Sequence, residues 1–294
     1  MTNKVKELII RTASGAVMLL VVVGALVLSK WSAGALFAVI MLGGLVEFYK
    51  LCQKRGYKPM CWVGISTSIA IFVGVFSLFI GDVLSQSAIV SLPYVAFACL
   101  AYMFLMIPTT FVMELWHKSP TPIENMATTF MGVIYLALPM AIVYYIPKML
   151  VGEWNAWAML AFMAIIWAND VFAYLVGVSI GKHRLCERIS PKKSWEGFVG
   201  GLVGAIGIAI LFGYLFKSNL YIWGGLGLVT ALAGVAGDLV ESLMKREADV
   251  KDSGKMMPGH GGFLDRFDAL YISVPFVVIY LIIAKFVEVA VVAA

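Results

Sequence analysis

The chain has 294 residues, of which 62% are hydrophobic and only 13% carry a charge, and its formal net charge is +5. Soluble domains usually carry about 25% charged residues, so this composition excludes an ordinary soluble protein and places most of the chain in lipid. The four cysteines have no CxxC motif and the three histidines are scattered, so neither residue type predicts a metal site.

Nine apolar segments follow one another along the chain, each close to the roughly 20 residues that a helix needs to cross a bilayer. We predict an all-α, polytopic membrane protein with about nine transmembrane helices, because backbone groups in lipid must form hydrogen bonds within the protein. The first run resembles a signal peptide, but its full spanning length favours a retained helix. The predicted spans are residues 8–29, 32–51, 60–82, 89–113, 127–147, 154–180, 195–216, 220–244 and 268–291.

The Lys and Arg residues provide an independent test of nine spans. With the N-terminus in the cytoplasm, 18 of the 22 cations fall on the cytoplasmic side, and only Lys30, Lys148, Lys217 and Lys285 fall outside. We therefore predict a cytoplasmic N-terminus. We divide the chain into N-terminal helices (1–150), which anchor, pack and make dimer contacts, and a C-terminal membrane region (151–294). This second region carries two long, charge-dense cytoplasmic loops, 181–194 and 245–267, and loops of such length usually have a function.

Among the acidic residues that lie within predicted spans, where charge is costly and usually faces a polar cavity, four are candidates for a site. All four fall toward the cytoplasmic helix ends, and Asp238 and Glu241, three residues apart, share one helix face. Each acid alone can equally be the partner of a neighbouring Lys or Arg, but their convergence favours a site. The four are Asp170, Glu196, Asp238 and Glu241.

The loop at 245–267 combines three residue types. Its cations suit phosphate oxygens, its glycines let backbone N–H groups approach an anion closely, and its carboxylates suit a divalent ion. Each feature has a simpler explanation: Asp265 can cap a helix, the cations can be ordinary positive-inside charge, and the glycines can turn the chain. Their combination predicts metal-assisted phosphate chemistry at the inner membrane surface. The residues are Lys245, Arg246, Lys251, Lys255, Arg266, Gly259, Gly261, Gly262, Asp265 and Asp268.

The loop at 181–194 adds cations and hydroxyl groups on the same side, including Lys192, Lys193 and Ser194. These three residues are candidates for binding a phosphate or nucleotide, although anchoring is the alternative for the lysines and Ser194 can cap the next helix. Trp195 can stack on a base, but a Trp at this depth is more often an interfacial belt residue.

Residues 242–268 resemble the signature of the phosphatidate cytidylyltransferases, S-x-x-K-R-x(4)-K-D-x-G-x(3)-P-G-H-G-G-x-x-D-R-x-D, and every fixed position is met. The segments Gly237-Asp238-Leu239 and Ser190–Gly197 are also similar to that family, as is Asn169-Asp170. The resemblance is sharp over about 165–270, whereas the first half of the chain matches only in length and helix pattern.

The resemblance implies that CTP and phosphatidic acid give CDP-diacylglycerol and pyrophosphate, in a homodimer that depends on Mg²⁺ with K⁺ as a second ion. Membrane lipids are the other partners, and no nucleic acid is expected. The location implied is the inner membrane of a bacterium, with the active site facing the cytoplasm. The family's metal-binding positions fall on Asp238, Asp265 and Asp268. The further catalytic candidates are Lys245, Arg246, Lys251, Asp252, His260 and Arg266, and the nucleotide-binding candidates are Lys192, Lys193, Ser194, Gly259, Gly261 and Gly262.

Two other functions fit the sequence less well. A CDP-alcohol phosphotransferase would carry a D-G-x-x-A-R motif, which this sequence lacks. A proton-coupled transporter would place charges near the bilayer midplane within two repeats, whereas these acids lie toward one face and we find no repeat.

Overall fold

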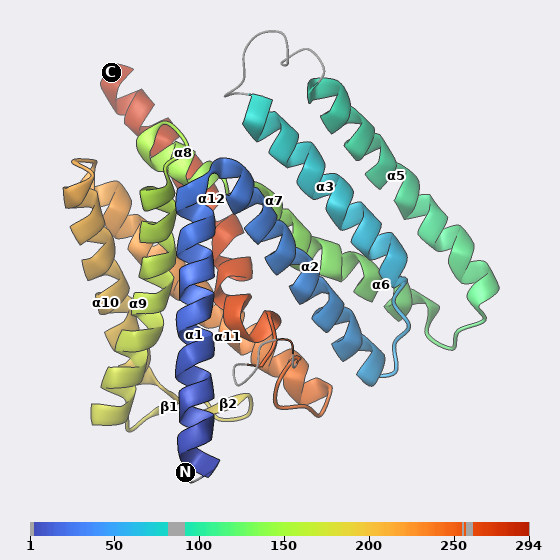
Figure 1. Cartoon of the computed structure of the whole chain (residues 1–294), viewed down its shortest axis with the longest axis horizontal. Helices are drawn as coiled ribbons and strands as arrows, with labels where there is room; N and C mark the ends of the chain where they lie inside the picture. Colours follow the sequence, from blue (N-terminus) through green and yellow to red (C-terminus); the bar gives the residue numbers. More distant parts are fainter. Residues whose placement is uncertain (1–2, 82–91, 255, 257–260, 294) are drawn as a thin grey trace. The chain divides into compact units, whose positions relative to one another are not determined.

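The computed structural model describes residues 3–81, 92–254, 256 and 261–293 (Figure 1). These residues are helical apart from connecting loops and one short hairpin, as expected for an all-α membrane protein. The helices are α1 (Asn3–Leu28), α2 (Lys30–Lys54), α3 (Cys61–Gly81), α5 (Leu92–His117), α6 (Pro122–Gly132), the π-helix η1 (Val133–Ala137), α7 (Leu138–Ile142), α8 (Tyr145–Val151), α9 (Ala156–Ile180), α10 (Trp195–Leu215), α11 (Leu220–Glu247) and α12 (Leu264–Ala293).

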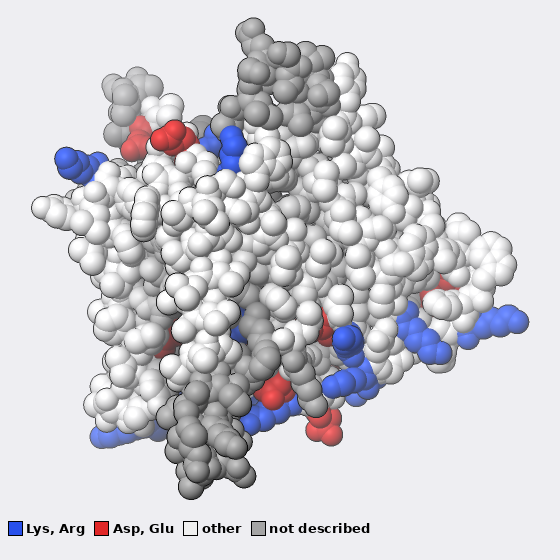
Figure 2. All heavy atoms as spheres, viewed as in Figure 1, with Lys and Arg blue, Asp and Glu red and all other residues white. Residues whose placement is uncertain are grey.

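Eight helices in the described part of the chain are long and apolar enough to cross a membrane, which agrees with a polytopic membrane protein. The predicted span 8–29 corresponds to α1, of which the structure describes the side chains from residue 12 on. The count of nine and the cytoplasmic N-terminus therefore stay predictions. On the face shown in Figure 2, the helix sides are almost free of charge, and Lys and Arg lie at the helix ends.

The chain divides into two compact units. The first contains residues 1–144 and 247–266, so the N-terminal helices pack with the loop between α11 and α12. Its core is aromatic: the centroid of the Tyr144 ring lies 5.1–6.2 Å from the ring centroids of Phe37, Phe72, Phe76 and Phe79. A second anchor is the hydroxyl of Tyr49, which donates a buried hydrogen bond of 2.8 Å to a backbone carbonyl of α6.

The second unit contains residues 145–246 and 267–294, which include α8 to α10 and most of α11 and α12. The helices α9 and α10 pack closely because small residues line their contact. A Cβ atom at Gly201 would lie 2.7 Å from the Asn169 side chain, and one at Gly197 would lie 2.7 Å from a carbonyl of α9. The pair therefore forms a tight antiparallel hairpin that leads into the loop at 181–194.

That loop is more ordered than the sequence indicated. It contains an antiparallel hairpin of β1 (Arg184–Cys186) and β2 (Ser190–Ser194), with Arg184 paired to Ser194. Short polar strands without apolar alternation give little strand signal. The other predicted loop, 245–267, is shorter in the structure, because α11 continues to Glu247 and α12 begins at Leu264. We call residues 248–263 the signature loop.

Candidate active site

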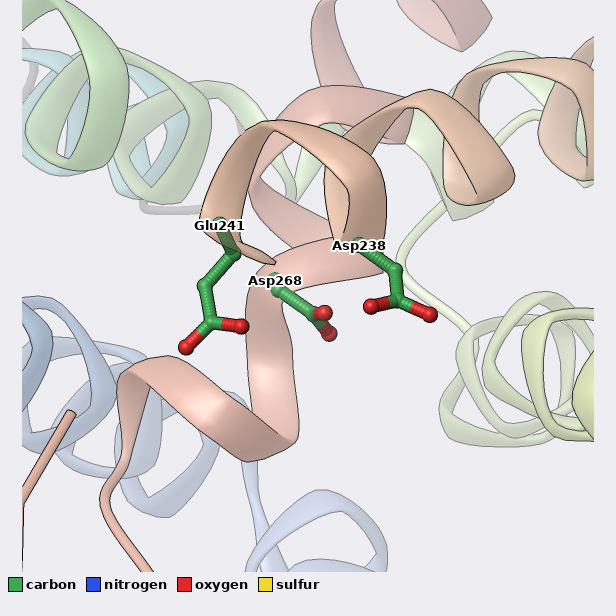
Figure 3. A group of neighbouring side chains, drawn as sticks. All are labelled: Asp238, Glu241 and Asp268. Carbon is green, nitrogen blue, oxygen red and sulfur yellow. The ribbon is translucent and has the colours of Figure 1, made fainter. Parts of the chain in front are cut away.

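Three carboxylates meet in the second unit where α11 and α12 pack together (Figure 3). Asp238 and Glu241 come from one face of α11, as their spacing predicted, and Asp268 comes from the first part of α12. One oxygen of each lies within 4.8 Å of the others, and Glu241 is buried. The helices approach closely here because Gly237 has no side chain, and a Cβ atom there would lie 2.6 Å from the Asp268 carbonyl oxygen.

Two lysines neutralise part of this negative charge. Lys193 Nζ lies 2.5 Å from Asp238 Oδ2, and Lys245 Nζ lies 2.5 Å from Glu241 Oε2 one helical turn away. Such pairing is needed because partly buried carboxylates at this separation repel one another strongly. Together, these five side chains form a group of three acidic and two basic residues. We refer to Asp238, Glu241, Asp268, Lys193 and Lys245 as the charged cluster.

The hairpin brings Lys193 to this cluster. Its geometry is fixed by Glu196, whose carboxylate accepts hydrogen bonds from the backbone N–H groups of Lys182 and His183 and lies 2.6 Å from His183 Nδ1. Ser194 Oγ accepts a hydrogen bond of 3.1 Å from Gly197 N and so caps α10, in agreement with one of its two sequence interpretations. Glu196 is thus used in holding the hairpin.

Asp265 makes contacts within the first unit. Its Oδ2 atom accepts hydrogen bonds from Gly262 N (2.8 Å), from Ser253 N (3.0 Å) and from Ser253 Oγ (2.9 Å). Gly261 precedes this contact with φ +86°, a conformation that favours glycine. The sequence grouped Asp265 with Asp238 and Asp268 as metal ligands, whereas the group that the structure brings together contains Glu241 as its third carboxylate. The role of Asp265 as a ligand stays a prediction.

The remaining candidates lie at exposed positions or outside the described residues. Lys192, Arg246, Lys251, Asp252 and Arg266 are exposed. Arg246 Nε is 3.5 Å from the Ile189 carbonyl oxygen, a long contact to the hairpin. Gly259 and His260 lie outside the described residues, so their roles stay predictions. In α9, Asn169 is buried, whereas its neighbour Asp170 is exposed.

Sequence reasoning missed one functional candidate, Glu47 in α2. Its side chain is buried, with 1% exposed, and its Oε2 atom accepts hydrogen bonds from Leu264 N (2.9 Å) and Ser253 Oγ (3.1 Å). A glutamate inside an otherwise apolar span was the available signal, because ionisable groups in spans are costly and usually functional.

An α-helical membrane protein whose carboxylates and lysines gather beside the cation-rich hairpin at 181–194 is suited to reactions of phosphates held by a metal ion. Comparison with known proteins defines the class further. Residues 9–284 match the model of the cytidylyltransferase family. The chain belongs to this family.

Individual relatives agree with that assignment. The chain is 31% identical over 275 residues to a phosphatidate cytidylyltransferase of Staphylococcus haemolyticus, an alignment that covers 93% of this chain and 98% of the relative. Enzymes of the same name from Bacillus subtilis and Haemophilus influenzae are 47% identical over 126 residues and 45% identical over 118 residues. These alignments cover 42% and 38% of this chain, and 45% and 41% of the relatives.

Proposed function

We propose that this protein is a phosphatidate cytidylyltransferase, which transfers the cytidylyl group of CTP to phosphatidate and releases pyrophosphate. The observation that carries the proposal is the charged cluster in a chain of the cytidylyltransferase family. The substrates suit the fold, because phosphatidate resides in the membrane and CTP comes from the aqueous side. We place the active site on the cytoplasmic face of a bacterial inner membrane, and we propose that the enzyme is a homodimer.

In the reaction, a phosphate oxygen of phosphatidate forms a bond to the α-phosphorus of CTP. The bond from that phosphorus to the oxygen bridging to the β-phosphorus breaks, and pyrophosphate leaves with the electron pair. The attacking phosphomonoester already carries a charge of about −1.5 to −2 near pH 7, so no strong general base is needed. Positioning and charge neutralisation are then the main contributions of the protein.

The charged cluster fits a divalent ion. Octahedral Mg²⁺ has ligands at about 2.1 Å, so neighbouring ligand oxygens are about 3 Å apart and opposite ones about 4 Å apart. The three carboxylate oxygens within 4.8 Å are close to this spacing. We propose that Asp238 and Asp268 hold Mg²⁺, with Glu241 or Asp265 as the third carboxylate and K⁺ as a second ion. Bound there, Mg²⁺ would neutralise charge that develops on the phosphates.

The cations of this chain act on the two anionic substrates. Lys193 and Lys245 lie in the charged cluster, where they reduce repulsion between the carboxylates and an incoming phosphate. The exposed Lys192, Arg246, Lys251 and Arg266 raise the local concentration of CTP through their positive field. We further propose that Ser194, Gly259, Gly261 and Gly262 contribute to binding the nucleotide phosphates, and that Asp252 and His260 act in catalysis.

The proposal is tested with purified protein in detergent, phosphatidate, Mg²⁺ and labelled CTP. We expect labelled CDP-diacylglycerol from the wild type and a loss of at least about 100-fold in Asp268→Asn, as for removal of one charged group that acts in the transition state. Glu288→Gln is the matched control, because Glu288 lies on the same helix but pairs with Lys285 far from the cluster. Equal activity of Asp268→Asn and the control would contradict the assignment.

A further inference from the structure

The N-terminal half of the chain contributes a buried carboxylate to the signature loop. Glu47 lies near the end of α2, and its Oε2 atom accepts one hydrogen bond from Ser253 Oγ and one from Leu264 N. Ser253 is in the early part of the signature loop, and Leu264 is the first residue of α12. One side chain therefore contacts both the early part of the signature loop and the start of α12.

The contact to Leu264 N is the kind of interaction that stabilises a helix start. The first N–H groups of a helix have no partner within the helix and favour negative charge. Glu47 provides a carboxylate acceptor from a helix more than 200 residues earlier in the chain. Because hydrogen bonds to charged groups are stronger than neutral ones, this contact fixes where α12 begins. Asp268 lies four residues, about one turn, further along the same helix.

At Gly254 and Gly262 the loop backbone packs so closely on Glu47 that a side chain at either position would have to displace the carboxylate. A Cβ atom at Gly254 would lie 2.1 Å from Glu47 Oε1, and one at Gly262 would lie 2.2 Å from Glu47 Oε2. One turn earlier on α2, a Cβ atom at Gly43 would lie 2.6 Å from the Phe263 ring. The face of α2 formed by Gly43 and Glu47 is therefore shaped to receive the two sides of the loop.

Ser253 connects Glu47 to Asp265. Its single hydroxyl hydrogen is shared between Glu47 Oε2, 3.1 Å from Ser253 Oγ, and Asp265 Oδ2, 2.9 Å from it, while its backbone N–H donates to Asp265. The described ends of the signature loop thus contact two carboxylates, Asp265 from the first turn of α12 and Glu47 from α2.

We propose that Glu47 is a positioning residue that holds Ser253 of the signature loop and the start of α12 in the positions used for cytidylyl transfer. The effect of Glu47 on catalysis rests on the proposed function. Its hold on Ser253 and Leu264 does not, because all three residues belong to the first unit. The helix α2 is then part of the catalytic machinery as well as a membrane anchor.

Limited trypsin digestion of the full-length protein in detergent tests the positioning without any activity measurement. Lys251 is exposed in the signature loop and provides the cleavage site. We expect Glu47→Ala to be cut after Lys251 about tenfold faster than the wild type, as expected for the loss of a charge-assisted hydrogen bond. Glu47→Gln, which keeps one oxygen acceptor, should lie between the two.

Glu114→Ala is the matched control, because Glu114 is also a buried glutamate of the first unit. It contacts Asn125 and His117 and makes no described contact with the signature loop. This variant should be less stable to heat but should be cut after Lys251 at the wild-type rate. Equal cleavage rates in Glu47→Ala, Glu114→Ala and the wild type would overturn the proposal.

A double-mutant cycle with Gly254 provides a second test. Gly254→Ala must displace the Glu47 carboxylate, because the three atoms nearest to the added Cβ all belong to Glu47. We expect Gly254→Ala to speed cleavage, and the double variant with Glu47→Ala to be cut no faster than Glu47→Ala alone. Additive effects would overturn the proposal.

Kinetics separate this inference from the proposed function. If the wild type makes CDP-diacylglycerol, Glu47→Ala should raise KM for CTP at least about tenfold, whereas Glu114→Ala should lower only the amount of folded enzyme. An inactive wild type with faster cleavage of Glu47→Ala would contradict the function and support the positioning. An unchanged KM in Glu47→Ala would overturn the catalytic part of the proposal.

Discussion

Replacement of Lys193 by methionine should tighten the binding of a divalent ion while it slows turnover. Lys193 Nζ lies 2.5 Å from Asp238 Oδ2, so a metal ion that binds Asp238 must compete with an ammonium group. Methionine keeps much of the apolar stem and removes the charge. The metal affinity of the free enzyme should therefore rise, although an incoming phosphate loses a favourable cation.

The size of the effect follows from the geometry. At 2.5 Å, the Coulomb attraction is about 1.7 kcal/mol in water and about 7 kcal/mol at an effective dielectric constant of about 20. The side chains are 25% and 39% exposed, so solvent screening and lost side-chain entropy reduce the net value to about 1–2 kcal/mol. Removal of this competition corresponds to an increase in metal affinity of about 5- to 30-fold.

The assay is Mn²⁺ binding to purified protein without substrate, followed by electron paramagnetic resonance. Lys192→Met is the control, because it removes the same charge from the neighbouring exposed position. We expect a clear increase in Mn²⁺ affinity for Lys193→Met and a much smaller change for Lys192→Met. Equal affinities in both variants and the wild type would refute the competition between Lys193 and the metal ion.

Two further predictions concern the packing around the site. Gly237→Ala should destabilise the protein by about 1–3 kcal/mol and abolish transfer, because the added Cβ meets the backbone of Asp268, which cannot shift without strain. Thermal unfolding and the transfer assay check this, and a stable, active variant would contradict it. Ser194→Ala should lower the free energy of unfolding by about 1 kcal/mol, because the α10 cap is lost. The same unfolding experiment measures this, with Ser194→Thr, which keeps the capping hydroxyl, as the control. Equal stability of the two variants would contradict the prediction.

Much of the fold was predictable because each span is a continuous apolar run of about 20 residues, and the membrane permits few alternatives to a helix. The shared face of Asp238 and Glu241 was also predictable, because it depends only on helical spacing. The hairpin Arg184–Ser194 was not, since its strands are short and polar and are fixed by Glu196.

The partners of the charged side chains could not be read from the sequence. The pairing of Lys193 with Asp238, and that of Glu47 with Ser253 206 residues away, depend on how separate segments pack. The signature made Asp265 a natural companion of Asp268, but the structure places its carboxylate against Ser253 and Gly262. A buried acid in an apolar span indicates that a partner exists, without identifying it.

The most direct test of cytidylyl transfer follows the two ends of the CTP triphosphate separately. Purified protein in detergent is incubated with phosphatidate, Mg²⁺ and CTP labelled at either the α- or the γ-phosphorus. We expect the α-label to enter the lipid, the γ-label to appear in pyrophosphate, and EDTA to abolish both. Transfer of the γ-label to the lipid, or no label in lipid from well-folded protein, would contradict it.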